Sequence, residues 1–330
     1  MFRLLTHTDV HQADSSPKAR LDDWTQSISD KLEQIARIAK ERDAFSVCAG
    51  DIFNFKSASK NSHALVRRTI ENYEKFGHKV PVCAGSHDFP FSDLSRIQSQ
   101  PLGVLESAKV IQMVDYENCK HMLVERGGVK ARIIGFPDTN KWTENKFDII
   151  EPYNQGFQIA LVHTFASSKT KEFFGNRVYQ YKDLAKYPVD IWVFGHWHFD
   201  QGIESIVDDA GDTKVFVNVG AISRGAYSYE NIDRIPSVGF VEFGYDDSGK
   251  KIINKIEQIR LKVKPAKEVF DVNAYEQLKK KKTEMSNFVR QLGLIQSTME
   301  ATTSDDYFKN LELENEVLTE IENYILRAQE

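Results

Sequence analysis

Short apolar runs and longer amphipathic stretches alternate along the first half of the chain. Apolar runs over residues 2–6, 45–49 and 80–84 are typical of buried strands. Two stretches between them, residues 21–42 and 62–76, have the length and pattern of helices. This order of strands and helices predicts a parallel sheet with helices packed over it. The first helix repeats apolar residues at helical spacing, and its expected buried face is Trp24, Ile28, Leu32, Ile35, Ile38 and Ala39.

The second half of the pattern predicts hairpins. Residues 121–135, 203–219 and 239–263 each contain two strand-like segments around a turn that is rich in glycine or aspartate. Apolar runs over residues 157–162 and 191–194 predict two further buried strands. The sum is an α/β sandwich of about 265 residues, in which two stacked sheets lie between outer helices.

The pattern changes after Pro265. Residues 266–330 look helical, with one helix expected over residues 275–292 and a last helix that Ser304 could cap. We therefore predict two parts, a sandwich domain over residues 1–265 and a short helical C-terminal segment over residues 266–330.

Composition narrows the class of protein. Hydrophobic residues make up 41% and charged residues 28% of the chain, as in ordinary globular proteins. No apolar stretch approaches the roughly 20 residues of a membrane span, and no targeting peptide precedes the first strand, so we expect no membrane association and a cytoplasmic location. The net charge of −5 gives no overall basic field, so a nucleic-acid partner would have to be attracted by local basic patches and by bound metal ions.

Polar residues gather where predicted strands end. A single block of this kind is weak evidence, because one histidine is more often satisfied by a carbonyl in the core. Five such blocks in five loops are stronger evidence for a metal site, because their carboxylates and imidazoles together suit divalent cations such as Mn²⁺. Two metal ions would in turn favour in-line attack on phosphorus. The blocks are Asp9-Val10-His11, Gly50-Asp51, Gly85-Ser86-His87-Asp88, His163 and Gly195-His196-Trp197-His198.

In type and order these blocks resemble the motif series of the calcineurin-like metallophosphoesterase superfamily, over roughly residues 1–230. The resemblance implies a four-layer αββα sandwich with a short helical C-terminal extension. It also implies two divalent metal ions, Mn²⁺ or alternatively Mg²⁺, with one ligand set for each and one bridging carboxylate. The implied ligands of the first metal ion are Asp9, His11 and His198, and those of the second are His163 and His196. The implied bridging carboxylate is Asp51.

The third block holds the remaining implied roles and one departure. His87 would act as the general acid, with Asp88 orienting its ring. Ser86 stands where the family has an asparagine ligand, and a hydroxyl is a poorer ligand than an amide carbonyl. We therefore hypothesise that the second metal, at Asp51, His163 and His196, binds more weakly.

Finer matches resemble the SbcD-type nucleases of DNA double-strand-break repair, in a short phage-like or bacterial form. They are Gly50-Asp51-Ile52-Phe53, residues 95–105 and the loop over residues 218–224. Asn54, where some members carry a DNA-positioning histidine, and Arg224 in the late loop are the candidate substrate contacts. The resemblance implies DNA ends as substrate and exonuclease activity, with endonuclease activity as an addition. It also implies a homodimer and an SbcC-like coiled-coil ATPase bound to the C-terminal helices, in a bacterial cell or a phage-infected host.

Other interpretations remain open. The chain could be a stand-alone metallophosphatase or small-nucleotide phosphodiesterase on the same fold. A non-catalytic scaffold that retains the fold is a further alternative. The C-terminal helices could equally pack back on the sandwich instead of binding a partner.

Overall fold

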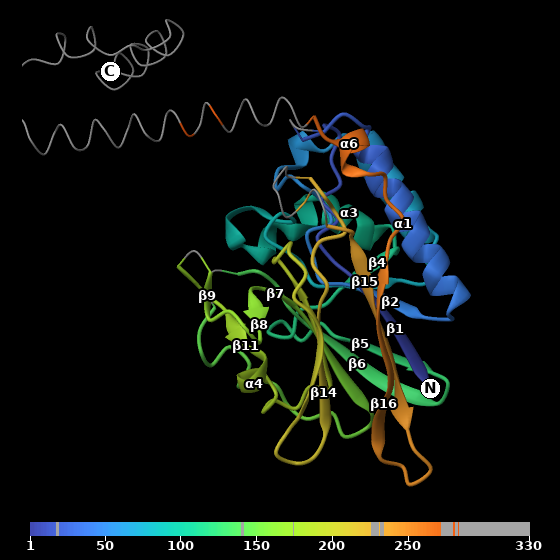
Figure 1. Ribbon diagram of the computed structural model, residues 1–330, viewed down its shortest axis with the longest axis vertical. Coiled ribbons are helices and arrows are strands. Elements are labelled where there is room, and N and C mark those ends of the chain that lie inside the picture. Colours follow the sequence, from blue (N-terminus) through green and yellow to red (C-terminus); the bar gives the residue numbers. More distant parts are fainter. Residues whose placement is uncertain are drawn as a thin grey trace, which may run out of the picture. The chain divides into compact units, whose positions relative to one another are not determined.

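Two six-stranded sheets pack face to face and enclose a central core (Figure 1). In this computed structural model the chain divides into Met1–Val272 and Asn273–Glu330, and the fold described below is that of the first unit. The helices expected over residues 275–292 and after Ser304 lie outside the described residues. The structure describes residues 1–271 except 18–19, 140–141, 174, 226–230 and 232–233, together with Lys280 and Thr283.

The first sheet contains the predicted parallel strands. Its order is β16-β15-β1-β2-β3-β4, in which β1 to β4 run parallel and β15 pairs antiparallel with β1. The parallel arrangement expected from the alternation of strands and helices is therefore confirmed. The strands are β1 (Phe2–His7), β2 (Phe45–Cys48), β3 (Val80–Val82), β4 (Ile111–Met113), β15 (Ser237–Tyr245) and β16 (Lys251–Arg260).

The second sheet combines two hairpins with a parallel centre. Its order is β13-β14-β12-β7-β6-β5, and the four inner strands are parallel. All three predicted hairpins form, but the last one, β15–β16, extends the first sheet instead of this one. The strands are β5 (Met122–Arg126), β6 (Val129–Phe136), β7 (Phe157–His163), β12 (Ile191–Gly195), β13 (Gly202–Val207) and β14 (Thr213–Asn218).

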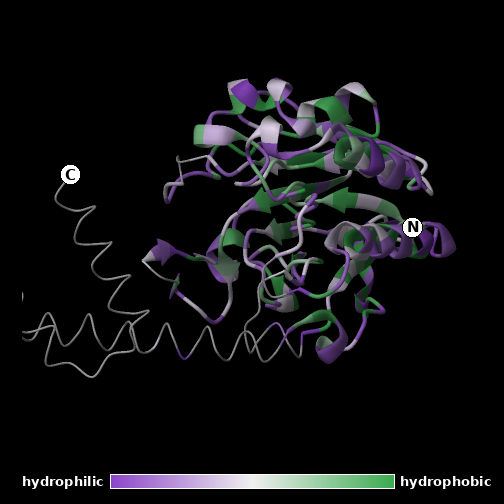
Figure 2. Cartoon of the chain, turned by 90° about the horizontal axis from the view of Figure 1, so that it is seen from above, coloured by the Kyte–Doolittle hydropathy of each residue, from purple (hydrophilic) through white to green (hydrophobic). Residues whose placement is uncertain are grey.

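Helices cover the outer face of the first sheet. They are α1 (Trp24–Glu41), α2 (His63–Glu74) and α3 (Pro101–Ser107). Helix α1 begins three residues later than the pattern predicts, because the Asp23 carboxylate caps it by accepting a hydrogen bond from the Gln26 amide at 2.9 Å. Its face, including Ile28 and Leu32, packs on the sheet as expected. Figure 2 shows the hydrophobic residues concentrated in the strands and the hydrophilic ones along the outer helices and loops.

The outer layer of the second sheet is thin. In the described residues it is built mainly from turns and very short elements that pack aromatic side chains such as Phe147, Tyr181 and Trp192 on the sheet. The predicted sandwich is confirmed, but this fourth layer is mostly irregular where helices were expected. None of the described helices combines the length and apolarity that crossing a membrane requires. The remaining elements are β8 (Ala166–Ser167), β9 (Glu172–Phe173), β10 (Asn176–Arg177), β11 (Tyr179–Gln180), α4 (Tyr181–Leu184), α6 (Ala266–Val269) and the 3₁₀ turns η1 (Ala58–Lys60), η2 (Pro90–Ser92) and η3 (Leu94–Ser99).

Candidate metal centre

The five polar blocks meet at the carboxyl ends of β1, β2, β3, β7 and β12. These strands belong to both sheets, so the loops that follow them converge from two sides. Backbone bonds join the first two loops: the amide of Asp9 donates to the Gly50 carbonyl, and that of His11 donates to the Asp51 carbonyl, both at 2.9 Å. The site is therefore placed by the packing of the two sheets.

Four side chains form a cluster suited to a metal ion. Ligand atoms of Asp9, His11, Asp51 and His198 all lie within 4.8 Å of one another. The Nε2 atoms of His11 and His198 are 2.9 Å apart, and His198 Nε2 is 3.6 Å from Asp9 Oδ1. Three of the four are buried, whereas the His198 side chain is 44% exposed, so the cluster is open to solvent on that side. The structure thus brings the first predicted ligand set together with the predicted bridge.

Asp51 and a neutral His163 ring would present two hydrogen-bond acceptors to each other. His163 Nδ1 lies 2.7 Å from the carbonyl oxygen of Ala49, which can only accept, so Nδ1 carries a proton. Nε2 of the neutral ring then has a bare lone pair, 3.2 Å from Asp51 Oδ2 and buried without a hydrogen-bond donor. A proton or a metal cation between these two atoms would remove the repulsion. The same Asp51 oxygen is 3.9 Å from His11 Nε2, as expected of a carboxylate shared by two ions.

His196 completes the second predicted set less tightly. Its ring contacts the His163 ring edge to face, with centroids 5.2 Å apart. Its backbone amide donates to both carboxylate oxygens of Asp9, at 3.1 and 3.2 Å, which links the two sets. The weaker second site that we hypothesise from Ser86 stays a prediction.

The pKa values of the candidate histidine ligands are shifted in different directions. Burial lowers the pKa of His11 to about 4, and burial together with neighbouring His163 lowers that of His196 to about 4. Both are therefore neutral at pH 7, as metal ligands must be. Burial acts in the same direction on His163, but the Asp51 carboxylate outweighs it and raises the pKa of His163 to about 10.

Four of the candidate ligands have a strained backbone. Asp9, His11 and Asp51 each have φ of 51°, and His196 has φ of 84°. These values lie in the left-handed region, which residues other than glycine seldom adopt. Each such residue costs on the order of 1–3 kcal/mol, and such strain persists where the surroundings fix it, typically at functional sites.

Glycines of the blocks allow the loops to approach His163. A Cβ at Gly85 would lie 2.2 Å from Asp51 Oδ1 and 2.5 Å from His163 Cε1. A Cβ at Gly195 would lie 2.3 Å from the Ala49 carbonyl oxygen that accepts from His163. These two glycines are therefore needed for close approach of the backbone to the site.

His87 lies beside the cluster and is oriented by the main chain. Its ring is edge-on to that of His11, with centroids 4.9 Å apart. Its Nδ1 donates to the carbonyl of Asn54 at 2.7 Å, which leaves Nε2 to hold or release a proton. Asn54, predicted as a substrate contact, thus contributes its carbonyl to orienting His87.

The role predicted for Asp88 is wrong. Its carboxylate is buried and accepts four backbone N–H groups instead of orienting the His87 ring. These donors lie in the second and third blocks, so Asp88 holds the loop that carries Asp51. Spacing places Asp88 next to His87, but the turn directs the two side chains apart. The donors are the amides of Asp51, Ile52, Phe53 and Gly85.

Two other predicted residues take positions that the sequence did not define. The Ser86 hydroxyl donates to Asp51 Oδ2 at 3.5 Å, so it contacts the bridging carboxylate. Arg224 donates to the carbonyls of Arg234 and Lys264, at 3.3 and 2.7 Å, which are structural contacts in the described residues.

Sequence reasoning missed Asp138. It follows β6, and its amide donates to the carbonyl of Ala84 in the third block at 3.2 Å. Its carboxylate acts on both histidines of the second set, adding to Asp51 in raising the pKa of His163 and partly offsetting the lowered pKa of His196. The signal was available, since Asp138 is another aspartate directly after an apolar strand.

Comparison with known proteins identifies the family. The family model of the calcineurin-like phosphoesterases matches residues 2–200, which include all five blocks. The chain belongs to this family. Metallophosphoesterases bind two divalent metal ions and hydrolyse phosphoester bonds, and the buried acceptors of Asp51 and His163 fit that requirement. Among curated protein sequences, none is significantly similar to this chain.

Several solved structures have a similar fold. A Staphylococcus aureus protein assigned as a 5′-nucleotidase is 15% identical, with a TM-score of 0.51 over 86% of this chain and 58% of its own. Haemophilus influenzae NAD nucleotidase is 13% identical, with a TM-score of 0.45 over 87% of this chain and 60% of its own. Yellow lupin purple acid phosphatase is 15% identical, with a TM-score of 0.43 over 73% and 49%. This chain thus spans about three fifths of the two nucleotidases.

Proposed function

We propose that this phosphoesterase is a Mn²⁺-dependent phosphodiesterase that cleaves DNA, as the nuclease subunit of an SbcCD-like complex that processes DNA ends. The hydrolytic part rests on one observation above all: Asp51 Oδ2 lies 3.2 Å from His163 Nε2 inside the protein, a position that a proton or a metal cation must occupy. The DNA part is supported by the finer sequence matches at Gly50-Asp51-Ile52-Phe53 and in the loop over residues 218–224.

The residues around the centre suit phosphodiester hydrolysis. When bound, two divalent cations would polarise the phosphoryl group and acidify an attacking water. His87 would protonate the leaving oxygen through Nε2, because Nδ1 is held by the Asn54 carbonyl. Asp88 would keep Asp51 in place through the backbone of its loop.

An aromatic wall beside His196 supports a substrate that carries a base. Phe165 contacts the rings of His196 and Trp197, with centroids 4.4 and 5.5 Å apart, and Phe173 contacts Trp197 at 4.9 Å. Phe165 remains partly exposed. Bases stack on such surfaces with little regard to sequence. The same wall would suit a single nucleotide, so a nucleotidase or small-nucleotide phosphodiesterase is the second candidate.

Substrate class is the decisive test. Full-length protein with Mn²⁺ is offered end-labelled duplex and hairpin DNA, a bis-aryl phosphodiester and an aryl phosphomonoester, with Asp51→Asn as the inactive control. We expect cleavage of DNA and of the diester. Hydrolysis of the monoester alone would establish the second candidate, and no hydrolysis of any substrate would favour a scaffold.

The resemblance to SbcD-type nucleases is the basis for proposing two protein partners. We propose that residues 271–330 bind a coiled-coil ATPase and that two catalytic domains associate as a homodimer. Deleting residues 271–330 should abolish co-purification with the ATPase while sparing hydrolysis of the small diester. A deleted protein that fails to fold would instead support packing of the segment on the domain. Sedimentation of the full chain tests the dimer.

A further inference from the structure

Lys31 is a basic residue on the buried face of α1. It lies one turn beyond Ser27 and two turns beyond Trp24, and only 4% of its surface is exposed. Its Nζ is buried and has no hydrogen-bond partner in the described part of the chain; its nearest ring is Trp24, 5.8 Å away. Burial, and then Arg20 and Arg224, lower the pKa of Lys31 to about 7. A buried ammonium without a partner is costly, so Lys31 gives up its proton readily, and an anion bound beside it would stabilise the charged form.

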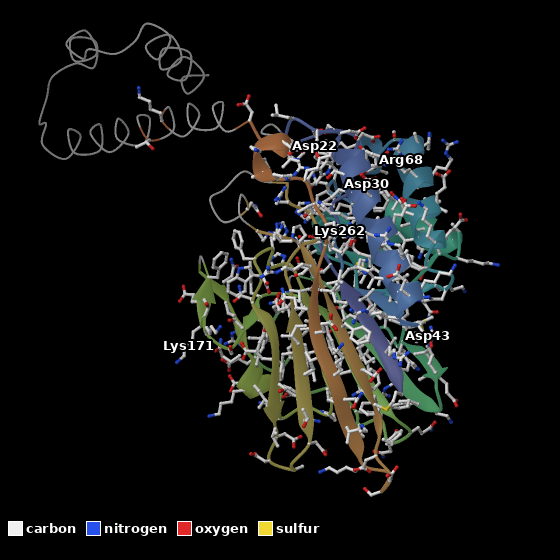
Figure 3. The ribbon with its side chains drawn as sticks, turned by 45° about the vertical axis from the view of Figure 1, so that its right-hand side comes forward. Asp22, Asp30, Asp43, Arg68, Lys171 and Lys262 are labelled. Carbon is white, nitrogen blue, oxygen red and sulfur yellow. The ribbon has the colours of Figure 1, made fainter. Side chains whose placement is uncertain are left out.

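A cavity of about 340 Å³ lies next to Lys31. It is bounded by the start of α1 on one side and by the segment after β16, with α6, on the other. Figure 3 labels three of its lining residues, Asp22, Asp30 and Lys262. None of the lining residues is a candidate metal ligand. The cavity is therefore separate from the metal centre described above.

Among the described residues that line the cavity, basic side chains outnumber acidic ones. The basic ones are Arg20, Lys31, Arg224, Lys262 and Lys264, against the acidic Asp22, Asp23 and Asp30. The acidic side chains already have partners in the structure. Asp22 accepts two bonds of 2.7 Å from the Arg20 guanidinium, Asp23 caps α1, and Asp30 accepts from the Gln26 side chain at 2.7 Å.

The basic side chains around the cavity differ in whether they already have hydrogen-bond or ion-pair partners. Arg20 and Arg224 donate to Asp22 and to backbone carbonyls, so they mainly build the wall. Lys262 and Lys264 are exposed and lie along the mouth. Lys31 alone combines burial with an ammonium that has no partner in the residues described. The amino group without a partner thus lies at the buried side of the cavity, and two exposed lysines lie at its solvent side.

We propose that this cavity binds the phosphate group of a phosphorylated small molecule of about nucleotide size, with Lys31 as the inner charged contact and Lys262 and Lys264 at the entrance. Small-molecule pockets have volumes of roughly 300–1,000 Å³, and a lone inorganic phosphate would leave most of this one unfilled. The Gln26 and Ser27 side chains offer polar contacts to the remainder of such a ligand. The proposal does not depend on the DNA substrate proposed above.

Calorimetry tests the site on the full-length Mn²⁺-loaded protein. The titrants are deoxyadenosine monophosphate, inorganic phosphate and deoxyadenosine. We expect the nucleotide to bind at two places, the metal centre and the cavity. Lys31→Met has similar volume and removes only the charge, so it should weaken the cavity event at least about tenfold while sparing the other. Lys182→Met, an exposed lysine on α4, is the matched control and should change neither.

A second variant protects the test against a folding defect. Lys262→Gln with Lys264→Gln changes only exposed residues and should weaken the cavity event several-fold, most at low salt. Nucleotide binding without phosphate binding would identify a phosphomonoester as the ligand, and equal binding of both would identify the phosphate group itself. The proposal would be overturned if wild type, Lys31→Met and the double variant gave the same titrations with deoxyadenosine monophosphate and with inorganic phosphate. Binding of deoxyadenosine as tight as that of the nucleotide would also overturn it.

Discussion

At the scale of single residues, His163 is the side chain whose state must change when a metal ion binds. Its Nδ1 is committed to the Ala49 carbonyl, and its Nε2 faces Asp51. With a pKa of about 10, the ring keeps a proton on Nε2 at neutral pH. A cation at this position must displace that proton.

Metal binding should therefore release protons at pH 7. Calorimetric titration with Mn²⁺, in two buffers of different ionisation enthalpy, should show about one proton released for the ion that contacts His163. Affinity at that site should rise from pH 7 to pH 9, because a higher pH removes the competing proton. His11, with its pKa of about 4, adds no proton at pH 7. Binding without proton release would contradict the assignment of His163.

His87 and Asp88 are neighbours in sequence with separate roles, and substitution should distinguish them. Asp88→Asn leaves one acceptor oxygen for four amide donors, so we expect a loss of about 3 kcal/mol or more in unfolding free energy and weaker Mn²⁺ binding. His87→Gln should lower kcat by about 10²–10⁴ and leave both of those quantities unchanged. Urea unfolding, Mn²⁺ calorimetry and diester hydrolysis measure the three effects. If Asp88→Asn lowered kcat alone, Asp88 would act through His87 after all.

At the scale of elements, strand ends determine the site, because each ligand loop leaves its strand under tight steric limits. Gly85, after β3, shows this best, since its Cα hydrogens lie where any side chain would meet Asp51 and His163. The helices of the first sheet contribute less directly, by fixing the strands from outside.

Gly85→Ala should displace Asp51 and His163 from each other. The added methyl would lie 2.2 Å from Asp51 Oδ1, so one of the two loops must shift. We expect Mn²⁺ affinity to fall about 10–100-fold, the range seen when residues that support metal ligands are altered. Gly249→Ala is the control: it has open space around it and φ of 80°, so it should strain a distant turn without changing Mn²⁺ affinity. Unchanged affinity in Gly85→Ala would show that the loops can adapt.

Elements with a clear period were predictable and short ones were not. Strands β1, β2, β7 and β12 and helices α1 and α2 follow their apolar patterns to within a few residues at each end. The thin layer around α4 was missed because elements of two to four residues contain too few positions to show a period. That β15 pairs with β1 was also not predictable, since hairpin patterns do not specify which sheet they join.

The same limit applies within the site. The position of Asp9 and Asp51 at one edge follows from the order of parallel strands, which the sequence predicts. His163 ends β7 in the other sheet, so its arrival at the site depends on how the two sheets pack, which the sequence does not specify. The direction of Asp88 does not, because a turn between neighbouring residues separates side chains that spacing would pair. Asp138 was overlooked because it stands alone, without a histidine or glycine beside it to mark it.

At the scale of the whole molecule, buried histidines link stability to pH. Burial lowers the pKa of His7 to about 3, and its Nε2 lies 3.3 Å from the Tyr73 hydroxyl under the first sheet. The unfolded chain binds a proton here below about pH 6.5 while the folded chain does not, so stability falls as the pH drops from 6.5 towards 3.

Urea unfolding at pH 6.5 and pH 5, with a chelator present, should show this dependence. His7 alone contributes about 2 kcal/mol over that interval, at about 1.36 kcal/mol per pH unit. His7→Gln cannot titrate, so its unfolding free energy should fall less steeply between the two pH values, even if it is lower at both. Parallel pH dependences of the wild type and the variant would show that His7 is protonated inside the fold.

The pairing of β1 has a consequence for how the protein is made. Phe2 pairs with Phe243, and Leu4 with Val241, while the other edge of β1 pairs with β2. A ribosome delivers β1 long before β15, because the other strands of both sheets except β16 lie between them in the sequence. Until then, the strand that leads to Asp9 has one open edge, which other chains can pair with. The nascent protein is thus open to pairing with other chains along this edge until β15 emerges.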